Sequence, residues 1–534
     1  MSKLKNRNWL YILISTLGAV LVWWGTSRGA GVGGDATIYM TSAKNFAEGI
    51  GLGIIGADGA FRLVPYFPPF YPIFLSVFSL FHLDLVMVAR VVNTILIAAT
   101  IYLVLRASDQ VIKDWRYTAA LGLLLAVSPV LNPAFSWVMS EPLSILLGTA
   151  SLILCLQVIK KPKHNNLFYF SAILAGFSTL TRYGAIVYTA TACMLLLIFL
   201  NGKFAQRLRQ SMIYGLIALC PVMIWAVVDM LLTNSISSRS VHGLEGMGAR
   251  IVSFFINLKS VLLFWLIPDS WILTPFYPQI LNTILSIVFV TLIIIGSWFL
   301  FKKSKIDQHL KLFGTALMLF FILYVLMTFV ISLVTYPPIT IGTRMFSPMY
   351  LMAFWLIALI LYQISVAVKG RQWLYRATLA VSIVLVFWSG WRGIRIVQDN
   401  HQTGLGFQSI AWQESDLIDY VNDLPEDQGL VTNEEMAVLF IAERNAYPFA
   451  EIYYDKPVDV FTMYGEGQDV NVSETQFRDH GAYLVLFDSI YSQFEGMYAE
   501  KSEQRLQILT NGLDLIYQGN DGCIYQYALS IEEK

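Results

Sequence analysis

The stretch Gly31-Val-Gly-Gly-Asp-Ala-Thr-Ile-Tyr-Met-Thr-Ser-Ala-Lys-Asn-Phe-Ala-Glu-Gly49 follows the first strongly apolar segment of the chain and carries an acid, Asp35, near its start. Glycines precede Asp35 and a helix-compatible run, 35–48, follows it, which makes Asp35 a candidate helix N-cap. The same position holds a carboxylate just outside the apolar segment, where it can take a proton from a substrate. The two roles are compatible, because a capping carboxylate keeps a second oxygen free.

The composition indicates a protein embedded in a membrane. Of the 534 residues, 56% are hydrophobic and 13% are charged, whereas soluble chains carry about 25% charged residues. The net charge is zero, so no bulk attraction to nucleic acid is expected. The four cysteines form no CxxC motif or Cys/His cluster, which excludes the usual disulfide framework and structural metal site. The basic N-terminus lacks a small-residue cleavage site and predicts a retained first span.

A spanning helix needs about 20 mostly apolar residues, and eleven segments come near that length. They are 9–26, 84–106, 116–132, 142–160, 167–181, 184–200, 211–231, 279–301, 312–334, 346–368 and 377–396. The fifth and sixth segments are separated only by Thr181-Arg-Tyr-Gly184. The predicted fold class is therefore an α-helical polytopic membrane protein with its termini on opposite sides of the membrane.

Basic residues mark every second loop between these spans. They are Lys3, Lys5 and Arg7; Arg106, Lys113 and Arg116; Lys160, Lys161 and Lys163; Lys203, Arg207 and Arg209; Lys302, Lys303, Lys305 and Lys311; and Lys369, Arg371 and Arg376. By the positive-inside rule these loops and the N-terminus face the cytoplasm. The outer face then holds loop 27–83, the turn before 142, loop 232–278, whose apolar part 251–267 is expected in the interface plane, and everything after about 398.

The tail has the composition of a soluble domain. We expect a transmembrane domain over 1–398 and a small extracytoplasmic α/β domain over 399–534. The expected elements of the tail are a helix at 412–424, a strand from Gly429, a helix 434–443 capped by Asn433, a strand at 482–487, and a hairpin turning at Gly519-Asn-Asp-Gly522.

Two acids and two arginines are the chemical candidates on the outer face. Glu141, in Ser140-Glu141-Pro142, is either a helix-start acid favoured by the helix dipole or, if it faces the same cavity as Asp35, a second catalytic, orienting or metal-binding carboxylate. Arg182 and Arg344 are natural partners for a phosphate, and the alternative for each is contact with lipid headgroups. Arg62 is a further, weaker candidate, whereas Lys44 is expected to pair with Glu48.

Five short motifs on this topology resemble the C-type glycosyltransferase superfamily, and within it the branch of protein O-mannosyltransferases and lipid A aminoarabinose transferases. They are Gly34-Asp35-Ala-x-x-Tyr39, Pro68-Pro-Phe-Tyr-Pro72, Ser140-Glu141-Pro142-Leu, Gly176-Phe-Ser-Thr-Leu-Thr-Arg182 and Gly342-Thr-Arg344-Met-Phe-x-Pro348. The likeness covers about residues 1–400. Several members of the family have a paired acidic motif where Asp35 stands without an acidic neighbour, and a tyrosine is commoner at position 345 than this Met.

The resemblance implies an inverting transfer from a polyprenyl-phosphate sugar to an acceptor hydroxyl of a protein, lipid or glycan. Asp35 and Glu141 would be the catalytic residues, and Arg182, Arg344, Arg62 and Tyr39 would bind substrate. The resemblance identifies no definite cofactor, and it leaves open whether a divalent metal is needed. The expected location is the plasma (inner) membrane, with the active site extracytoplasmic and serving the cell envelope. A transporter or lipid flippase is the alternative; it would place charged or broken helices near the mid-plane, with repeats between its halves.

Overall fold

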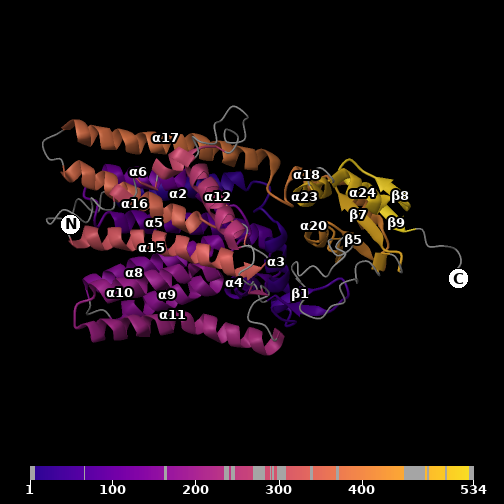
Figure 1. The fold of residues 1–534 in the computed structure, drawn as a ribbon, viewed down its shortest axis with the longest axis horizontal. Coiled ribbons are helices and arrows are strands. Elements are labelled where there is room, and N and C mark those ends of the chain that lie inside the picture. Colours follow the sequence, from indigo (N-terminus) through magenta and orange to yellow (C-terminus); the bar gives the residue numbers. More distant parts are fainter. Residues whose placement is uncertain are drawn as a thin grey trace.

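The computed structural model consists of a helical bundle with a small sheet domain at one end (Figure 1). It describes residues 7–64, 67–161, 165–233, 240–241, 247–268, 283–288, 290–291, 294–296, 308–336, 339, 341–367, 372–449, 476–477, 480–498 and 502–527. The part before the sheet domain contains the helices α2 (Asn8–Gly25), α3 (Gly34–Ala47), α4 (Phe70–Ser79), α5 (Leu85–Ser108), α6 (Trp115–Ala126), α7 (Leu131–Ala134), α8 (Glu141–Lys160), α9 (Asn165–Thr181), η1 (Tyr183–Ala185), α10 (Ile186–Phe199), α11 (Phe204–Thr233), α12 (Met247–Leu266), α15 (Gln308–Val334), α16 (Ser347–Ala367) and α17 (Gln372–Thr403).

Eight of the described helices are long and apolar enough to cross a membrane, so the chain is a multi-pass membrane protein. These helices are α2, α5, α8, α11, α12, α15, α16 and α17. Shorter apolar helices, α4, α9 and α10, lie among them. The predicted break between the fifth and sixth segments is confirmed, because α9 ends at Thr181 and α10 begins at Ile186. About half of the span expected at 279–301 lies outside the described residues.

Helix α12 differs from its sequence expectation. Lys259 does not interrupt it, and its 20 residues meet the length and composition of a span. The buried Arg392 of α17 donates to the carbonyls of Trp265 (3.1 Å) and Ile267 (3.0 Å), where the last turn of α12 leaves its carbonyls without helical partners. A cation at a helix C-terminus is stabilising, so α12 is held as part of the bundle.

Two short antiparallel strand pairs lie outside the sheet domain. They are β1 (Gly53–Ile55) with β2 (Phe61–Leu63), and β3 (Ser240–Val241) with β4 (Thr335–Tyr336). The sheet domain is built from α18 (Ile410–Gln413), α19 (Asp416–Asp423), β5 (Leu430–Thr432), α20 (Glu435–Ile441), β6 (Tyr447–Pro448), β7 (Tyr483–Phe487), α23 (Ser489–Tyr498), α24 (Ser502–Thr510), β8 (Leu513–Gln518) and β9 (Gly522–Tyr527).

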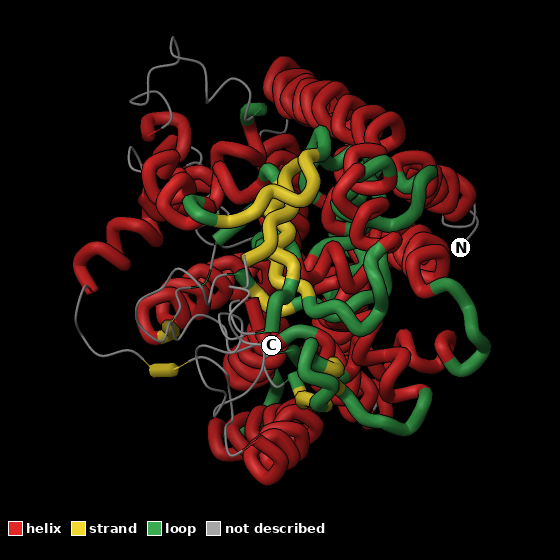
Figure 2. The backbone as a smooth tube through the Cα atoms, turned by 90° about the vertical axis from the view of Figure 1, so that its right-hand side faces the viewer, coloured by secondary structure: helices red, strands yellow, loops and turns green. Residues whose placement is uncertain are grey.

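The five described strands of the domain form a mixed sheet in the order β6-β5-β7-β9-β8, drawn in yellow in Figure 2. The pairs β5–β6 and β5–β7 are parallel, with Val431 opposite Leu484, and β9 runs antiparallel to both β7 and β8. The α/β class and the predicted hairpin at Gly519–Gly522 are confirmed. The helix expected at 412–424 is instead two helices, because Ser415 caps α19 by accepting from Ile418 N–H.

Asn433 does not cap a helix, so that prediction is wrong. Its Oδ1 accepts from Phe487 N–H at 2.9 Å, and its Nδ2 donates to the Ser489 hydroxyl at 2.9 Å. Helix α20 begins at Glu435 after Glu434, whose side chain makes no cap bond. Asn433 therefore joins the carboxyl ends of the parallel strands β5 and β7.

Glu434 gives the sheet domain a predictable pH dependence. Burial raises the pKa of this carboxyl, although the Ser489 hydroxyl that donates to it works in the opposite direction. A raised folded-state pKa favours the neutral form, so its contribution to stability is complete below the unfolded value and is lost as pH rises through the folded value. We expect Glu434→Gln to melt at a higher temperature than the wild type near pH 7 and at a similar temperature near pH 4. Equal differences in Tm at the two pH values would contradict this assignment.

Candidate functional site

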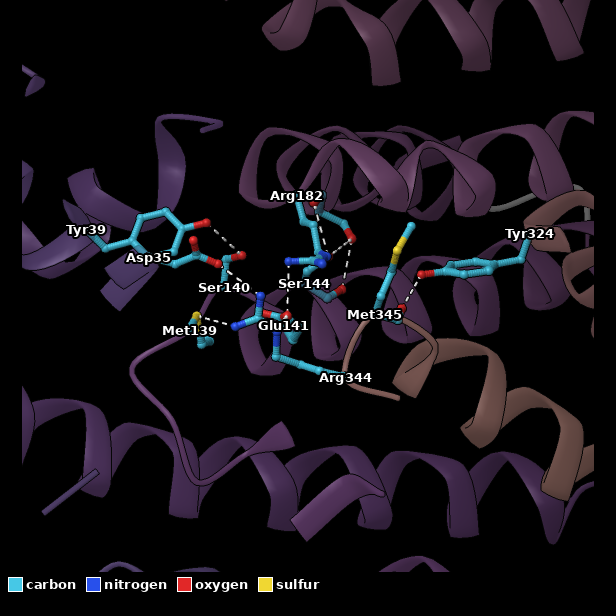
Figure 3. A network of polar contacts seen from close by, with 11 residues as sticks. Asp35, Tyr39, Met139, Ser140, Glu141, Ser144, Arg182, Tyr324, Arg344 and Met345 are labelled. Atoms are coloured by element: carbon cyan, nitrogen blue, oxygen red, sulfur yellow. Dashed lines mark hydrogen bonds and ion pairs between the residues drawn. The ribbon is translucent and has the colours of Figure 1, made fainter. Parts of the chain in front are cut away.

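Four side chains predicted from sequence meet in one network of polar contacts (Figure 3). One of them belongs to α3, which lies at the end of the bundle next to the sheet domain (Figure 1). Glu141 Oε1 lies 3.0 Å from Arg182 Nη1 and 3.1 Å from Arg344 Nε. Arg344 Nη2 lies 2.9 Å from Asp35 Oδ2. The result is a chain of alternating charges, Arg182–Glu141–Arg344–Asp35, drawn from four segments that are far apart in sequence.

The four residues differ in their exposure to solvent. The side chain of Glu141 is fully buried, at 0% exposure, whereas the side chains of Asp35 and Arg344 are both 42% exposed and that of Arg182 is 24% exposed. Burial lowers the pKa of Arg344, but the carboxylates of Glu141 and Asp35 more than offset this, so that its pKa is raised. Both arginines stay charged. Glu141 is therefore the buried counter-ion of the two arginines, and Asp35 and Arg344 are the solvent-exposed members of the network.

The place of Asp35 in its helix differs from the one predicted from the sequence. Helix α3 starts at Gly34 with Gly33 as N-cap, and no side chain caps it. The N-cap prediction for Asp35 is therefore wrong. Asp35 lies in the first turn, where the helix dipole favours a carboxylate, and its side chain pairs with Arg344.

Glu141 is the first residue of α8, with Pro142 after it, as the sequence indicates. One turn further along, Ser144 of α8 and Ser178 of α9 hydrogen bond to each other's backbone carbonyl groups, at 3.3 and 2.8 Å. These bonds join α8 to α9 just below the Glu141–Arg182 pair. Arg182 itself lies at the break between α9 and η1, which places its guanidinium at the helix end.

Arg344 lies in the turn before α16. This turn is held by a contact that was not predicted from the sequence. The buried Tyr324 of α15 donates its hydroxyl to the Met345 carbonyl, and Arg344 Nη1 lies 3.2 Å from Met139 Sδ. A tyrosine within an apolar span needs a partner for its hydroxyl. That need was the available signal for Tyr324, although it does not name the partner.

Tyr39 lies one helical turn after Asp35. Its hydroxyl is 3.3 Å from the Ser140 hydroxyl, and its ring packs on Phe67 and Tyr71 at centroid distances of 4.6 and 5.1 Å. The aromatic residues just before and at the start of α4 thus pack against α3. Burial raises the pKa of Tyr39 well above its usual value, so its hydroxyl stays protonated.

Arg62 is placed on β2, where it forms an ion pair with Asp58 across the hairpin and also contacts the Ala60 carbonyl at 3.4 Å. The Arg62 guanidinium lowers the pKa of Asp58. The described contacts therefore connect Arg62 to its own hairpin, and the structure does not bring it into the Arg182–Glu141–Arg344–Asp35 chain.

Three backbone segments pair beneath the site. Gly31 N–H donates to Ser136 O at 2.8 Å, Val138 N–H donates to Gly31 O at 2.9 Å, and Phe407 N–H donates to Val32 O at 2.8 Å. Gly31 and Val32 lead into α3, 136–138 lead into α8, and Phe407 belongs to the linker that enters the sheet domain. These isolated bridges hold the segment that leads to Asp35 in the middle. The segment that leads to Glu141 pairs with it on one side, and the linker pairs with it on the other.

Gly406 is required for this pairing. Its φ is +56°, and a Cβ there would lie 2.0 Å from Val32 O. We expect Gly406→Ala to push the linker off Val32 and cost about 1–2 kcal/mol, and a reaction that used Asp35 and Glu141 would slow about tenfold or more, because small misplacements of catalytic groups are costly. Gly512→Ala is the matched control, since Gly512 also has a positive φ but no atom within 4 Å of its Cβ position. Equal loss of activity in both variants would contradict the role of the linker.

The donor set fits an anion better than a metal ion. The described residues contain no group of three or more His, Cys, Asp or Glu side chains placed to hold a metal. Both carboxylates at the site already face guanidinium groups. Two arginines that contact the same carboxylate match the paired, charge-assisted hydrogen bonds that a phosphate accepts.

Comparison by sequence finds no matching family model and no matching curated protein. Comparison by structure finds ArnT from Cupriavidus metallidurans in the apo state, with a TM-score of 0.57 and 11% identity over 98% of each chain. The oligosaccharyltransferase of Archaeoglobus fulgidus in the apo form aligns with a TM-score of 0.55 and 13% identity, over 98% of this chain and 75% of that one.

The chain has the fold of the C-type glycosyltransferases. Both similar proteins, ArnT and the archaeal oligosaccharyltransferase, have this fold, and the alignments include the sheet domain as well as the bundle because they cover nearly the whole chain. The resemblance inferred from the five motifs is thus confirmed at the level of fold. In this C-type glycosyltransferase fold, the ion-paired residues Arg182, Glu141, Arg344 and Asp35 lie at the junction of the bundle and the sheet domain.

Proposed function

We propose that the chain is an inverting glycosyltransferase that moves a sugar from a polyprenyl-phosphate donor to an acceptor hydroxyl at the outer face of the plasma (inner) membrane. The observation that carries the proposal is the pair of arginines converging on one buried carboxylate next to Asp35. Support comes from the fold, because the Archaeoglobus fulgidus oligosaccharyltransferase AglB, at a TM-score of 0.53 and 13% identity, is known in complex with a dolichol-phosphate.

Arg182 and Arg344 would bind the phosphate of the donor. Charge builds on the phosphate as the bond to the sugar breaks, and fixed guanidinium groups stabilise that charge without reorganising. The partial exposure of both side chains, 24% and 42%, leaves them accessible from the open side of the site.

Asp35 would be the general base. The acceptor oxygen bonds to the anomeric carbon while its proton moves to the Asp35 carboxylate, and the bond from the anomeric carbon to the phosphate oxygen breaks. The polyprenyl phosphate leaves with the electron pair, and the configuration inverts in this single displacement. A base placed in this way contributes about 10²–10⁴ in rate.

Glu141 is assigned a positioning role. Its carboxylate is fully buried and contacts both guanidiniums through the same oxygen, so it has no open side for an acceptor. Of the roles open from sequence, catalytic, orienting or metal-binding, the orienting one fits this burial. Tyr39 of α3 is proposed to line the substrate site, and the role of Arg62 remains a prediction without a described contact to the other four residues.

The sharing of Arg344 suggests an order of events. Before the donor binds, Arg344 contacts the carboxylates of both Asp35 and Glu141. A phosphate competes with Asp35 for the same guanidinium, so donor binding would release the Asp35 carboxylate from its ion pair with Arg344. The carboxylate is then available to take the proton of the acceptor hydroxyl once the donor is in place.

A transfer assay tests the proposal against the transporter or flippase alternative. The purified chain in liposomes is given a labelled polyprenyl-phosphate sugar with candidate protein, lipid and glycan acceptors. We expect a new glycosidic product and free polyprenyl phosphate. Movement of the intact donor across the bilayer without a product would instead support the alternative.

A further inference from the structure

A cleft lies between the bundle and the sheet domain, on the side of α3 away from Asp35. Its volume is about 900 Å³, and its lining includes Thr41 and Lys44 of α3, Glu48 at the C-cap of α3, His82 after α4, Gln408 of the linker and Glu443 after α20. Helix residues advance by about 100° each, which turns Thr41, Lys44 and Glu48 to the face of α3 opposite Asp35. Figure 1 shows α3 at the end of the bundle next to α20. The cleft is therefore separate from the charged site.

Two residues of the lining have unusual backbone conformations. His82 (φ 54°) and Glu443 (φ 53°) are the non-glycine residues with positive φ among those the structure describes. Each follows the end of a helix, where glycine normally occupies this left-handed conformation because a side chain is unfavourable there. Strained residues of this kind gather at ligand-binding sites. Here both are found in one cleft, and both contribute a polar side chain to it.

The charges and polar groups of the cleft indicate the kind of ligand. Its carboxylates, Glu48, Glu443 and Asp84, outnumber its basic side chain, Lys44, which disfavours a phosphate or another anion. Lys44 and Glu48 are both exposed and form no ion pair with each other, contrary to their spacing, which leaves their polar groups for a ligand. Hydroxyl and amide groups, including those of Thr41 and Gln408, add further donors and acceptors.

Apolar side chains complete the site. Leu80 and Leu83 also line the cleft and are 59% and 50% exposed. A mixture of charged, hydroxyl and amide groups with a small apolar surface matches a sugar, whose hydroxyls both donate and accept while its C–H faces pack on apolar groups. The volume lies in the range of small-molecule sites. We propose that this cleft binds a neutral saccharide; with the proposed function, that saccharide is the part of the acceptor distant from the reacting hydroxyl.

Glycine substitutions test this directly, because glycine suits both strained positions. We expect the double variant His82→Gly/Glu443→Gly to have an unchanged or higher Tm and to lose saccharide affinity about tenfold or more, as two hydrogen-bonding side chains are removed. The control is Glu495→Gln, an exposed acid outside the cleft. The probe is a mixture of neutral saccharides released from the envelope of the native cells. Binding to the full chain is followed by hydrogen exchange.

The expected result is protection of peptides spanning 37–48, 79–86 and 439–443 in the wild type and in Glu495→Gln, with its loss in the double variant. Protection that persists in the double variant, no protection by any fraction, or a lower Tm of the double variant would each overturn the proposal. If saccharides protect these peptides in a protein that shows no sugar transfer, the proposed saccharide site stands. Only the proposal that the saccharide is part of the acceptor then fails.

Discussion

Asp35→Asn should slow sugar transfer by about 10²–10⁴ while polyprenyl phosphate binds as tightly as to the wild type or more tightly. The rate falls because the amide cannot accept the proton of the acceptor hydroxyl. Binding is kept because Arg344 loses its 2.9 Å contact with a competing carboxylate and becomes free for the phosphate. The two quantities are measured as kcat in the transfer assay and as Kd for polyprenyl phosphate by titration.

Asp58→Asn is the control for this variant, since Asp58 is another acid of the same outer loop and pairs with Arg62 rather than Arg344. We expect it to transfer sugar within about twofold of the wild type, in line with the small effects of surface ion pairs. Near-normal transfer by Asp35→Asn would remove Asp35 from the chemistry. A large loss of lipid affinity in that variant would instead show that Asp35 organises the phosphate site.

Glu141→Gln should have the largest effect on stability. It removes the buried counter-charge of two arginines, and breaking a buried pair costs about 3–5 kcal/mol. Because Arg182 and Arg344 are 24% and 42% exposed, water offsets part of this, and we expect about 2–3 kcal/mol. The measurement is the Tm of the purified chain.

The same variant separates a positioning role from a merely structural one. A bound phosphate supplies the missing negative charge, so polyprenyl phosphate should raise the Tm of Glu141→Gln by more than it raises that of the wild type. Ser144→Ala, which keeps all four charges, should show the wild-type response. An equal ligand-induced shift in Glu141→Gln and the wild type would mean that the phosphate does not meet these arginines.

The site was predictable from sequence to the extent that its charges are unusual for their surroundings. Asp35, Glu141, Arg182 and Arg344 each interrupt or border an apolar span, and the alternation of basic loops places all four on one face. Their pairing was not predictable, because the Arg344–Asp35 contact joins residues 309 positions apart. Nor does a sequence pattern show which of two carboxylates is buried.

The errors have a common physical origin. Asp35 and Asn433 were both interpreted as helix caps from local sequence, and in both cases a tertiary partner, Arg344 or the end of β7, takes the side chain instead. The single-residue bridges at Gly31 and Val32 could not be predicted from the sequence, because they have no period-2 hydrophobic pattern. The long apolar helices and the 519–522 hairpin were found because periodicity and turn residues are local signals.

The most direct test of the proposed donor site is a structure of the wild-type chain in lipid nanodiscs with polyprenyl phosphate bound. We expect the phosphate within about 3 Å of the guanidinium groups of both Arg182 and Arg344, with Arg344 moved away from Asp35 and Glu141 still between the two arginines. A phosphate bound elsewhere, with the Arg344–Asp35 pair intact, would contradict it.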